Sequence, residues 1–224
     1  SGQGRYGDVI MEIDWSVGQI MNKLKEHQLD KNTIFIFTSD NGPWLNFGNH
    51  AGSASPLREG KGTAWEGGQR EPCVVSYPNG IEGGRVIDTP MMTIDLLPTI
   101  AEITGAKLPE LKIDGKSVWD IWTGKSNKSP HDAYFFYYKS NELHGVRYND
   151  WKLYFPHTYP SLNGREGGKD GYPVNYDMNE IDEIELYDLR NDISESKNVA
   201  DQHPKIVLEI KSLADEMRKK LGDK

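Results

Sequence analysis

One run of six residues, Thr33–Thr38, most constrains what this chain can fold into. All six are β-branched or aromatic, a composition typical of a strand buried on both faces of a parallel sheet. The run stops at Ser39-Asp40-Asn41-Gly42, a turn-forming sequence. A helix is expected before it, because apolar residues recur on one helical face between Asp8 and about Gln28. These segments predict an α/β fold.

The next segments extend the α/β pattern. A short strand is expected over Cys73–Tyr77, and a helix over Asp95–Thr104 with Gly105 as its stop. The polar, glycine-rich segment 42–71 between the strands is a long loop, and such loops are uncommon unless they carry function. Cys73 is the only cysteine, which excludes a disulfide within the chain. Because it lies in an apolar run, we expect it to be buried.

The pattern changes near residues 123–131, a polar stretch that predicts a domain boundary. We expect residues 1–124 to belong to the α/β domain, and residues 125–224 to form a small antiparallel sheet with a C-terminal helix. The expected elements are strands at Tyr134–Tyr138, Leu143–Tyr148, Trp151–Phe155 and Glu185–Leu189, a turn at Asn149-Asp150, a loop at 156–183 and a helix from about Pro204.

Charge and hydropathy narrow the class of partner. The net charge of −8 argues against nucleic acid, which requires a basic face. No run of eighteen apolar residues is present, so the sequence predicts no membrane span. The start, Ser1–Arg5, is neither a methionine start nor a signal peptide. We therefore expect the chain to be an internal portion of a longer protein.

Asp40 and Asn41 are the first candidate ligands. Both follow the expected strand, where open α/β sheets bind their ligands, and both offer hard oxygen atoms that suit Ca²⁺ or Mg²⁺. Asp-Asn-Gly is also simply a favourable turn, and on spacing alone that interpretation is the more common one. Two ligands do not complete a calcium shell of about six to eight oxygens, so others must come from elsewhere.

Lys61 is the second candidate, because Gly60 and Gly62 allow the backbone to approach a ligand closely. A lysine there supplies a compact positive charge for an anionic oxygen. An exposed loop lysine is the commoner case, and the pattern is not that of a phosphate-binding loop. The six histidines show no zinc spacing, and no Gly-x-Ser-x-Gly elbow is present.

Taken in order, several segments together resemble the sulfatase family of the alkaline-phosphatase-like superfamily, both arylsulfatases and glycosaminoglycan-type sulfatases. The resemblance covers nearly the whole chain, and the combination is more specific than any one segment. The segments are Asp14–Gly18, Phe37–Pro43, Pro56–Thr63, Trp65–Pro72, Asp95–Thr99, Glu185–Leu189 and Asn191-Asp192.

The resemblance implies a fold and roles for particular residues. It implies the C-terminal part of an alkaline-phosphatase-like α/β sandwich. Asp40 and Asn41 match the family's second pair of metal ligands, usually for calcium, and Lys61 matches the lysine that contacts the sulfate group. His50 and Arg58 lie in the loop between them and could reach substrate.

The family's nucleophile is a formylglycine, made from the first residue of Cys/Ser-x-Pro-x-Arg. This chain lacks the motif: Cys73 is followed by Val74-Val75, and Ala54–Arg58 carries alanine at the nucleophile position. The resemblance thus implies that the nucleophile and the first aspartate pair belong to a missing N-terminal half, and that this chain alone is inactive. It also implies a periplasmic, secreted or lysosomal protein.

Two other functions stay open at this point. One is a phosphohydrolase or phosphodiesterase of the same superfamily, although these usually bind two transition metals through histidines. The other is a glycan-binding module built on Tyr134–Tyr138 and Trp151, although such a stripe is more often a sheet core. For a sulfatase we expect a sulfated carbohydrate rather than a small aryl sulfate as substrate, with loops 42–71 and 156–183 shaping the pocket.

Overall fold

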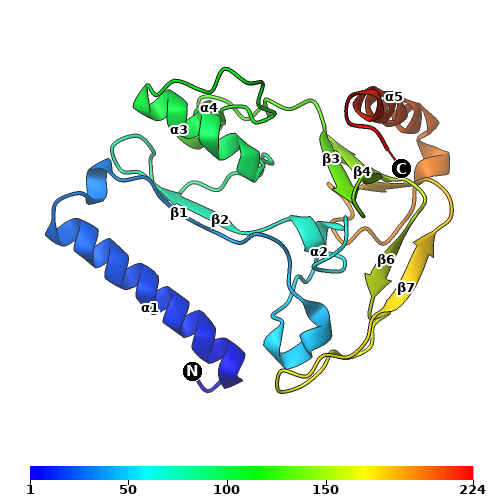
Figure 1. Ribbon diagram of the computed structural model, residues 1–224, viewed down its shortest axis with the longest axis horizontal. Helices are drawn as coiled ribbons and strands as arrows, with labels where there is room; N and C mark the ends of the chain where they lie inside the picture. The colour runs from blue at the N-terminus through cyan, green and yellow to red at the C-terminus, as the bar shows by residue number, and fades with distance from the viewer. Residues whose placement is uncertain (224) are drawn as a thin grey trace. The chain divides into compact units, whose positions relative to one another are not determined.

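The computed structural model describes residues 1–223, which fall into two compact units (Figure 1). The first unit contains residues 1–17, 38–73 and those from 133 onward. The second contains residues 18–37 and 74–132. Because the first unit is assembled from separate stretches, the glycine-rich segment 42–71 shares it with the C-terminal sheet.

A four-stranded antiparallel sheet is the centre of the first unit. Its strand order is β3 (Tyr134–Tyr138), β4 (Glu142–Tyr148), β5 (Trp151–Tyr154) and β8 (Glu185–Asp188). The predicted turn at Asn149-Asp150 joins β4 to β5, with Tyr148 opposite Trp151 and a φ of 54° at Asn149. Positive φ values are what tight hairpin turns require. The four predicted C-terminal strands are thus confirmed.

Helix α5 (Pro204–Leu221) covers this sheet (Figure 1). Proline is favoured in the first turn of a helix, where its missing N–H costs no hydrogen bond. Ile210 and Ala214 of α5 are completely buried together with Leu153 and Leu186 of the sheet. Helix η4 (Ala200–Gln202) directly precedes α5. The predicted arrangement of a sheet with a C-terminal helix is confirmed.

The aromatic run of β3 contributes to two clusters. Phe135 and Tyr137 pack against the α5 cluster, whereas Phe136 and Tyr138 pack against a second cluster that contains Trp65 and Tyr154. Successive side chains of a strand point to opposite faces of the sheet, so neighbouring residues of β3 pack against different clusters. This packing is that of a sheet core.

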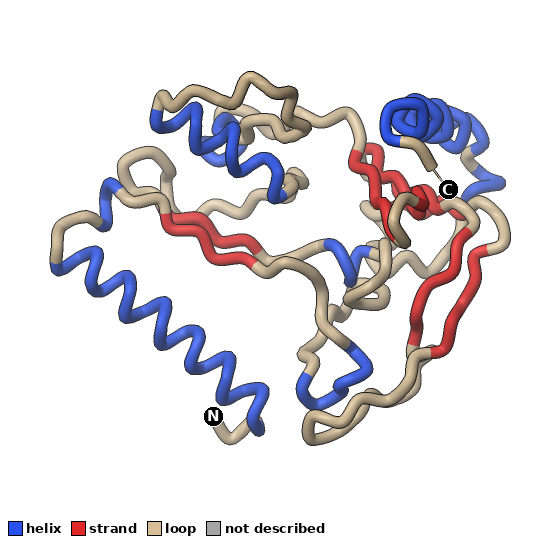
Figure 2. Tube along the Cα trace, viewed as in Figure 1, coloured by secondary structure: helices blue, strands red, loops and turns tan. Residues whose placement is uncertain are grey.

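The prediction that residues 156–183 form a loop is wrong. Two antiparallel strands, β6 (His157–Ser161) and β7 (Asp177–Ile181), lie within it (Figure 2). The buried positions of β6 are His157, Tyr159 and Ser161, so the strand alternates in burial without alternating in hydropathy. Periodicity analysis depends on apolar side chains and therefore misses it.

The second unit contains most of a two-stranded sheet and several short helices. The strands are β1 (Phe35–Thr38) and β2 (Cys73–Ser76). The helices are η1 (Asp30–Asn32), η3 (Thr93–Asp95), α3 (Leu96–Thr104) and α4 (Trp119–Thr123). Gly105 caps α3 with φ 72°, which confirms the predicted stop. The core of the unit forms around Val118, Ile121 and Trp122.

Two expectations about burial are wrong. Phe37 is 40% exposed, and Cys73 is exposed. A sheet of two strands has no neighbouring layers to bury both of its faces, so neither residue is enclosed within the described chain. The predicted N-terminal helix is confirmed as α1 (Gly4–Glu26), beginning four residues earlier than expected. Across residues 1–223, no helix has both the length and the hydropathy that a bilayer crossing needs.

Candidate functional site

The candidate metal ligands lie on the turn that follows β1. The Asp40 side chain is exposed, that of Asn41 is half-buried, and Gly42 is buried. The Gly42 amide donates to the Gly68 carbonyl at 3.1 Å. A Cβ at position 42 would lie 1.8 Å from the Gly67 carbonyl oxygen, so only glycine permits this close approach. The backbone contact fixes the turn against the segment that carries Lys61.

The backbone of Lys61 is hydrogen-bonded to the residue that follows the same turn. Its amide donates to the Pro43 carbonyl at 3.0 Å. Its exposed ammonium group lies 5.0 Å from the centroid of the Trp44 ring, a cation–π distance. Two backbone hydrogen bonds, Gly42–Gly68 and Lys61–Pro43, therefore bring together segments separated by about twenty residues. Asp40, Asn41 and Lys61 come from these two segments.

The donor set of the turn fits a hard cation. Asp40 and Asn41 supply carboxylate and amide oxygens, the ligand types that Ca²⁺ and Mg²⁺ prefer. Glu71 lies near them: burial, and then the charge of Asp40, raise the pKa of its carboxyl group. One Glu71 carboxylate oxygen is buried without a hydrogen-bond partner. A cation beside Asp40 would relieve this excess of negative charge. Over residues 1–223, no three His, Cys, Asp or Glu side chains gather in a metal-binding group.

The structure places Arg58 in a buried cluster. Its guanidinium lies 3.6 Å from the centroid of the Trp65 ring and donates to the Glu195 carbonyl at 2.8 Å. It also donates to the hydroxyls of Tyr159 and Tyr187, each at 3.3 Å. The planar guanidinium suits such combined stacking and hydrogen bonding. These contacts orient Arg58 toward the C-terminal sheet.

His50 lies at the end of η2 (Leu45–His50) and lines a different region. With Arg5, Asn49, Asp170 and Tyr172 it surrounds a cavity of about 450 Å³. The lining of this cavity includes neither Asp40 nor Lys61. Backbone hydrogen bonds therefore join the segments that carry Asp40, Asn41 and Lys61, whereas His50 and Arg58 lie in other surroundings.

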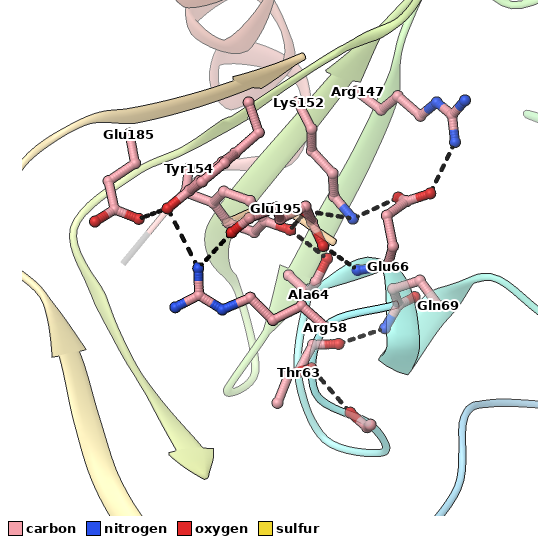
Figure 3. A network of polar contacts seen from close by, with 12 residues as sticks. Arg58, Thr63, Ala64, Glu66, Gln69, Arg147, Lys152, Tyr154, Glu185 and Glu195 are labelled. Carbon is pink, nitrogen blue, oxygen red and sulfur yellow. Dashed lines mark hydrogen bonds and ion pairs between the residues drawn. The ribbon is translucent and has the colours of Figure 1, made fainter. Parts of the chain in front are cut away.

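A network of buried charges contains Glu66, Lys152 and Glu195 (Figure 3). Glu66, at the start of α2 (Glu66–Gln69), accepts hydrogen bonds from Lys152 at 2.8 Å and from Arg147 at 3.0 Å. Its backbone amide donates to the carboxylate of Glu195 at 2.8 Å. Glu66, Lys152 and Glu195 are at most 2% exposed. Sequence analysis missed these residues, because their partners are 81 to 129 positions apart.

The pKa values of the two carboxylates in this network are shifted in opposite directions, although burial acts in the same direction on both. Burial raises the pKa of Glu66, but Lys152 and Arg147 outweigh it, so the pKa falls below its ordinary value. At Glu195 burial dominates over Lys152 and Tyr154, and the pKa is raised. Glu66 is thus held as the carboxylate that pairs with the two cations.

Comparisons with known protein families cover most of the chain. The family model described as "Sulfatase" matches residues 3–106, and the model described as "C-terminal region of aryl-sulfatase" matches residues 129–224. A model described as "N-sulphoglucosamine sulphohydrolase, C-terminal" matches residues 60–159.

Individual proteins agree with these matches. An arylsulfatase of Hemicentrotus pulcherrimus is 35% identical over 96% of the chain, and an N-acetylgalactosamine-6-O-sulfatase of Bacteroides thetaiotaomicron is 32% identical over 97%. A sulfatase structure from work on the metabolism of multiple glycosaminoglycans by Bacteroides thetaiotaomicron has a TM-score of 0.76 and 29% identity. It covers 95% of this chain and 44% of its own.

The relatives are much longer than this chain. The chain spans 41% of the Hemicentrotus protein and 42% of the Bacteroides enzyme. Its structural neighbours include sulfatases with the alkaline-phosphatase-like fold, which agrees with the fold class expected from the sequence.

Proposed function

Because the chain belongs to the sulfatase family, we propose that the protein containing it hydrolyses sulfate esters, and that this chain supplies part of the metal and sulfate site. The observation that carries the proposal is the backbone contact between the Asp40-Asn41 turn and the Lys61 segment. It joins the segment with the hard oxygen ligands to the segment with the cationic side chain, which supports a shared site for a sulfate group.

The proposed roles follow from the chemistry of each side chain. Asp40 and Asn41 bind a cation, for which Ca²⁺ is the proposed ion and Mg²⁺ the alternative. A bound cation would supply positive charge to the sulfate oxygens. Lys61 contacts another sulfate oxygen through its exposed ammonium group and stabilises charge that develops there. His50 is proposed to contact bound substrate, whereas Arg58 holds the Lys61 segment through the contacts described above.

The nucleophile is proposed to be a formylglycine outside these 224 residues, since Cys/Ser-x-Pro-x-Arg does not occur among them. The remaining metal ligands are proposed to lie in the same N-terminal part of the longer protein. We therefore expect the 224-residue chain alone to release no sulfate. We also propose that the protein acts in the periplasm, in a lysosome or outside the cell.

The proposed substrate is a sulfated carbohydrate, with aryl sulfates as artificial substrates. The Bacteroides relative is named for N-acetylgalactosamine 6-O-sulfate, which supports an amino-sugar sulfate as the first class to test. Sulfate release from sulfated glycosaminoglycan disaccharides and from a simple aryl sulfate would be compared on the full-length protein. A higher kcat/KM for the disaccharides is expected.

The central experiment measures sulfate release by the full-length protein from an aryl sulfate with calcium present. Asp40→Ala and Lys61→Ala are each expected to lower kcat by about 10²- to 10³-fold, the usual effect of removing one electrostatic contact to the transition state. Lys205→Ala, at an exposed position of α5, is the matched control and should retain activity. Calorimetric titration should show that Asp40→Ala also weakens Ca²⁺ binding.

The opposing result is equally specific. Turnover of a phosphate ester without sulfate release, together with zinc in the purified protein, would replace the sulfatase proposal with the phosphohydrolase alternative. Those enzymes bind transition metals, so metal content separates the two classes independently of the substrates chosen.

A further inference from the structure

The segment that carries Lys61, Arg58–Gln69, is a closed and tightly packed loop. The Gly67 amide donates to the Arg58 carbonyl at 2.8 Å and so joins its two ends. A Cβ at Gly68 would lie 2.5 Å from the carbonyl oxygens of Gly60 and Thr63, so the loop is in van der Waals contact across its interior. A displacement of its base therefore moves Lys61 as well.

The base of this loop is bound to the C-terminal sheet by Glu66. Its carboxylate accepts a hydrogen bond from the Lys152 ammonium of β5 at 2.8 Å and another from the Arg147 guanidinium of β4 at 3.0 Å (Figure 3). Its amide donates to Glu195 at 2.8 Å. Because Glu66 and Lys152 are almost completely buried, solvent does not screen this interaction, and the geometry is held by direct charge-assisted hydrogen bonds.

Further contacts strengthen the same connection. The Tyr154 hydroxyl donates to the Ala64 carbonyl at 3.1 Å and to the Glu195 carboxylate. Gln69 donates to the Tyr138 hydroxyl at 2.6 Å, and that hydroxyl donates to the Thr63 carbonyl at 2.9 Å. Each of these bonds joins the loop, or its Glu195 partner, to a strand of the sheet. The loop is therefore anchored at several points along its inner side.

We propose that Glu66, held by Lys152 and Arg147, is a positioning residue that fixes Lys61 for contact with the sulfate group. The inference rests on the proposed role of Lys61. Lys61 is exposed and has a flexible stem, so the position of its backbone decides where its ammonium group can reach. A displacement of about 1 Å at a reacting centre costs up to about 10²-fold in rate.

A double-mutant cycle on the full-length protein tests this coupling. Glu66→Gln keeps the side-chain shape but removes the charge, and it is expected to lower kcat about tenfold or more, with a smaller change in KM. Lys61→Ala/Glu66→Gln should be no slower than Lys61→Ala alone, because Glu66 acts through Lys61. Effects that multiply in the double variant would overturn the proposal, since they would show that Glu66 acts independently of Lys61.

Two further variants keep the test decisive. Arg147→Met removes only one of the two cations, so it tests positioning if Glu66→Gln does not fold; about a threefold lower kcat is expected, again without additivity to Lys61→Ala. Glu216→Gln, the same substitution at an exposed α5 position, should behave as wild type.

A measurement independent of activity separates the inference from the proposed function. Amide hydrogen exchange over residues 58–69 should become at least about tenfold faster in Glu66→Gln, while exchange in α5 stays unchanged. If wild-type protein releases no sulfate, the proposed function fails, but faster exchange confined to this loop still supports the conclusion that Glu66 fixes the position of the loop that carries Lys61. Unchanged exchange in the loop would refute it.

Discussion

Acidification should destabilise the first unit through His157, a buried residue of β6. His157 is 8% exposed, and its ring stacks on His144 at a centroid distance of 4.0 Å. Its Nδ1–H donates to the Phe155 carbonyl at 2.6 Å, and its Nε2 is buried without a partner. Protonation would place a positive charge on Nε2 in surroundings that offer it no acceptor.

The structure gives the size of this effect. The pKa of His157 is lowered from 6.5 to about 4, chiefly by burial and also by the charges of His144 and Lys139, whereas the Phe155 carbonyl and Glu142 oppose the change. Between these two pH values the unfolded chain binds the proton and the folded chain does not, so stability falls as the pH decreases. The loss is about 2 kcal/mol at pH 5 and approaches about 3 kcal/mol below pH 4.

The assay is urea unfolding of the full-length protein, followed by tryptophan fluorescence at pH 7, 6, 5 and 4. His157→Gln keeps a donor for the Phe155 carbonyl but does not titrate, so its free energy of unfolding should fall less than that of wild type over this range. The difference between the two proteins, rather than either alone, isolates His157. Equal slopes for wild type and variant between pH 6.5 and 4 would refute the reasoning.

Two further substitutions test the contacts around the site. Gly42→Ala should displace the Asp40-Asn41 turn, since its Cβ would lie 1.8 Å from the Gly67 carbonyl; calcium titration should then show at least about tenfold weaker binding, and unchanged affinity would contradict this. Tyr154→Phe should lower the free energy of unfolding by about 1–3 kcal/mol, because it leaves buried acceptors of Ala64 and Glu195 without their donor. A loss below about 0.5 kcal/mol in urea unfolding would show that water or another donor replaces the hydroxyl.

The sequence predicts the elements in which apolar residues recur at the period of a helix or a strand. Helix α5 and strands β3, β4, β5 and β8 carry apolar or aromatic residues at the period of their structure, so their ends agree with the prediction within about one residue. Strands β6 and β7 were missed because the buried face of β6 is made of His157, Tyr159 and Ser161. The burial of β1 was overestimated, because side-chain type shows a preference for burial but does not show which neighbours are present.

The residues of the candidate site also differ in whether the sequence alone indicates them. Asp40, Asn41 and Lys61 were recognised from local turn and glycine patterns combined with the family resemblance, and they remain predictions of function. Glu66 and Lys152 could not be paired from the sequence, since 86 positions separate them and neither lies in a pattern that indicates its partner. Tertiary structure alone brings the acid of the glycine-rich loop to the cations of the sheet.

The buried ion pairs between α2 and the sheet also limit where the sequences of two sulfatases can be recombined. A chimera with its crossover between residues 69 and 147 takes Glu66 from one parent and both cations from the other. Where the second parent lacks a cation at position 147 or 152, the buried carboxylate of Glu66 loses one of its two partners. Breaking a buried ion pair completely costs about 3–5 kcal/mol. Fragments exchanged between these enzymes to alter substrate choice should therefore leave Glu66, Arg147, Lys152 and Glu195 together from a single parent.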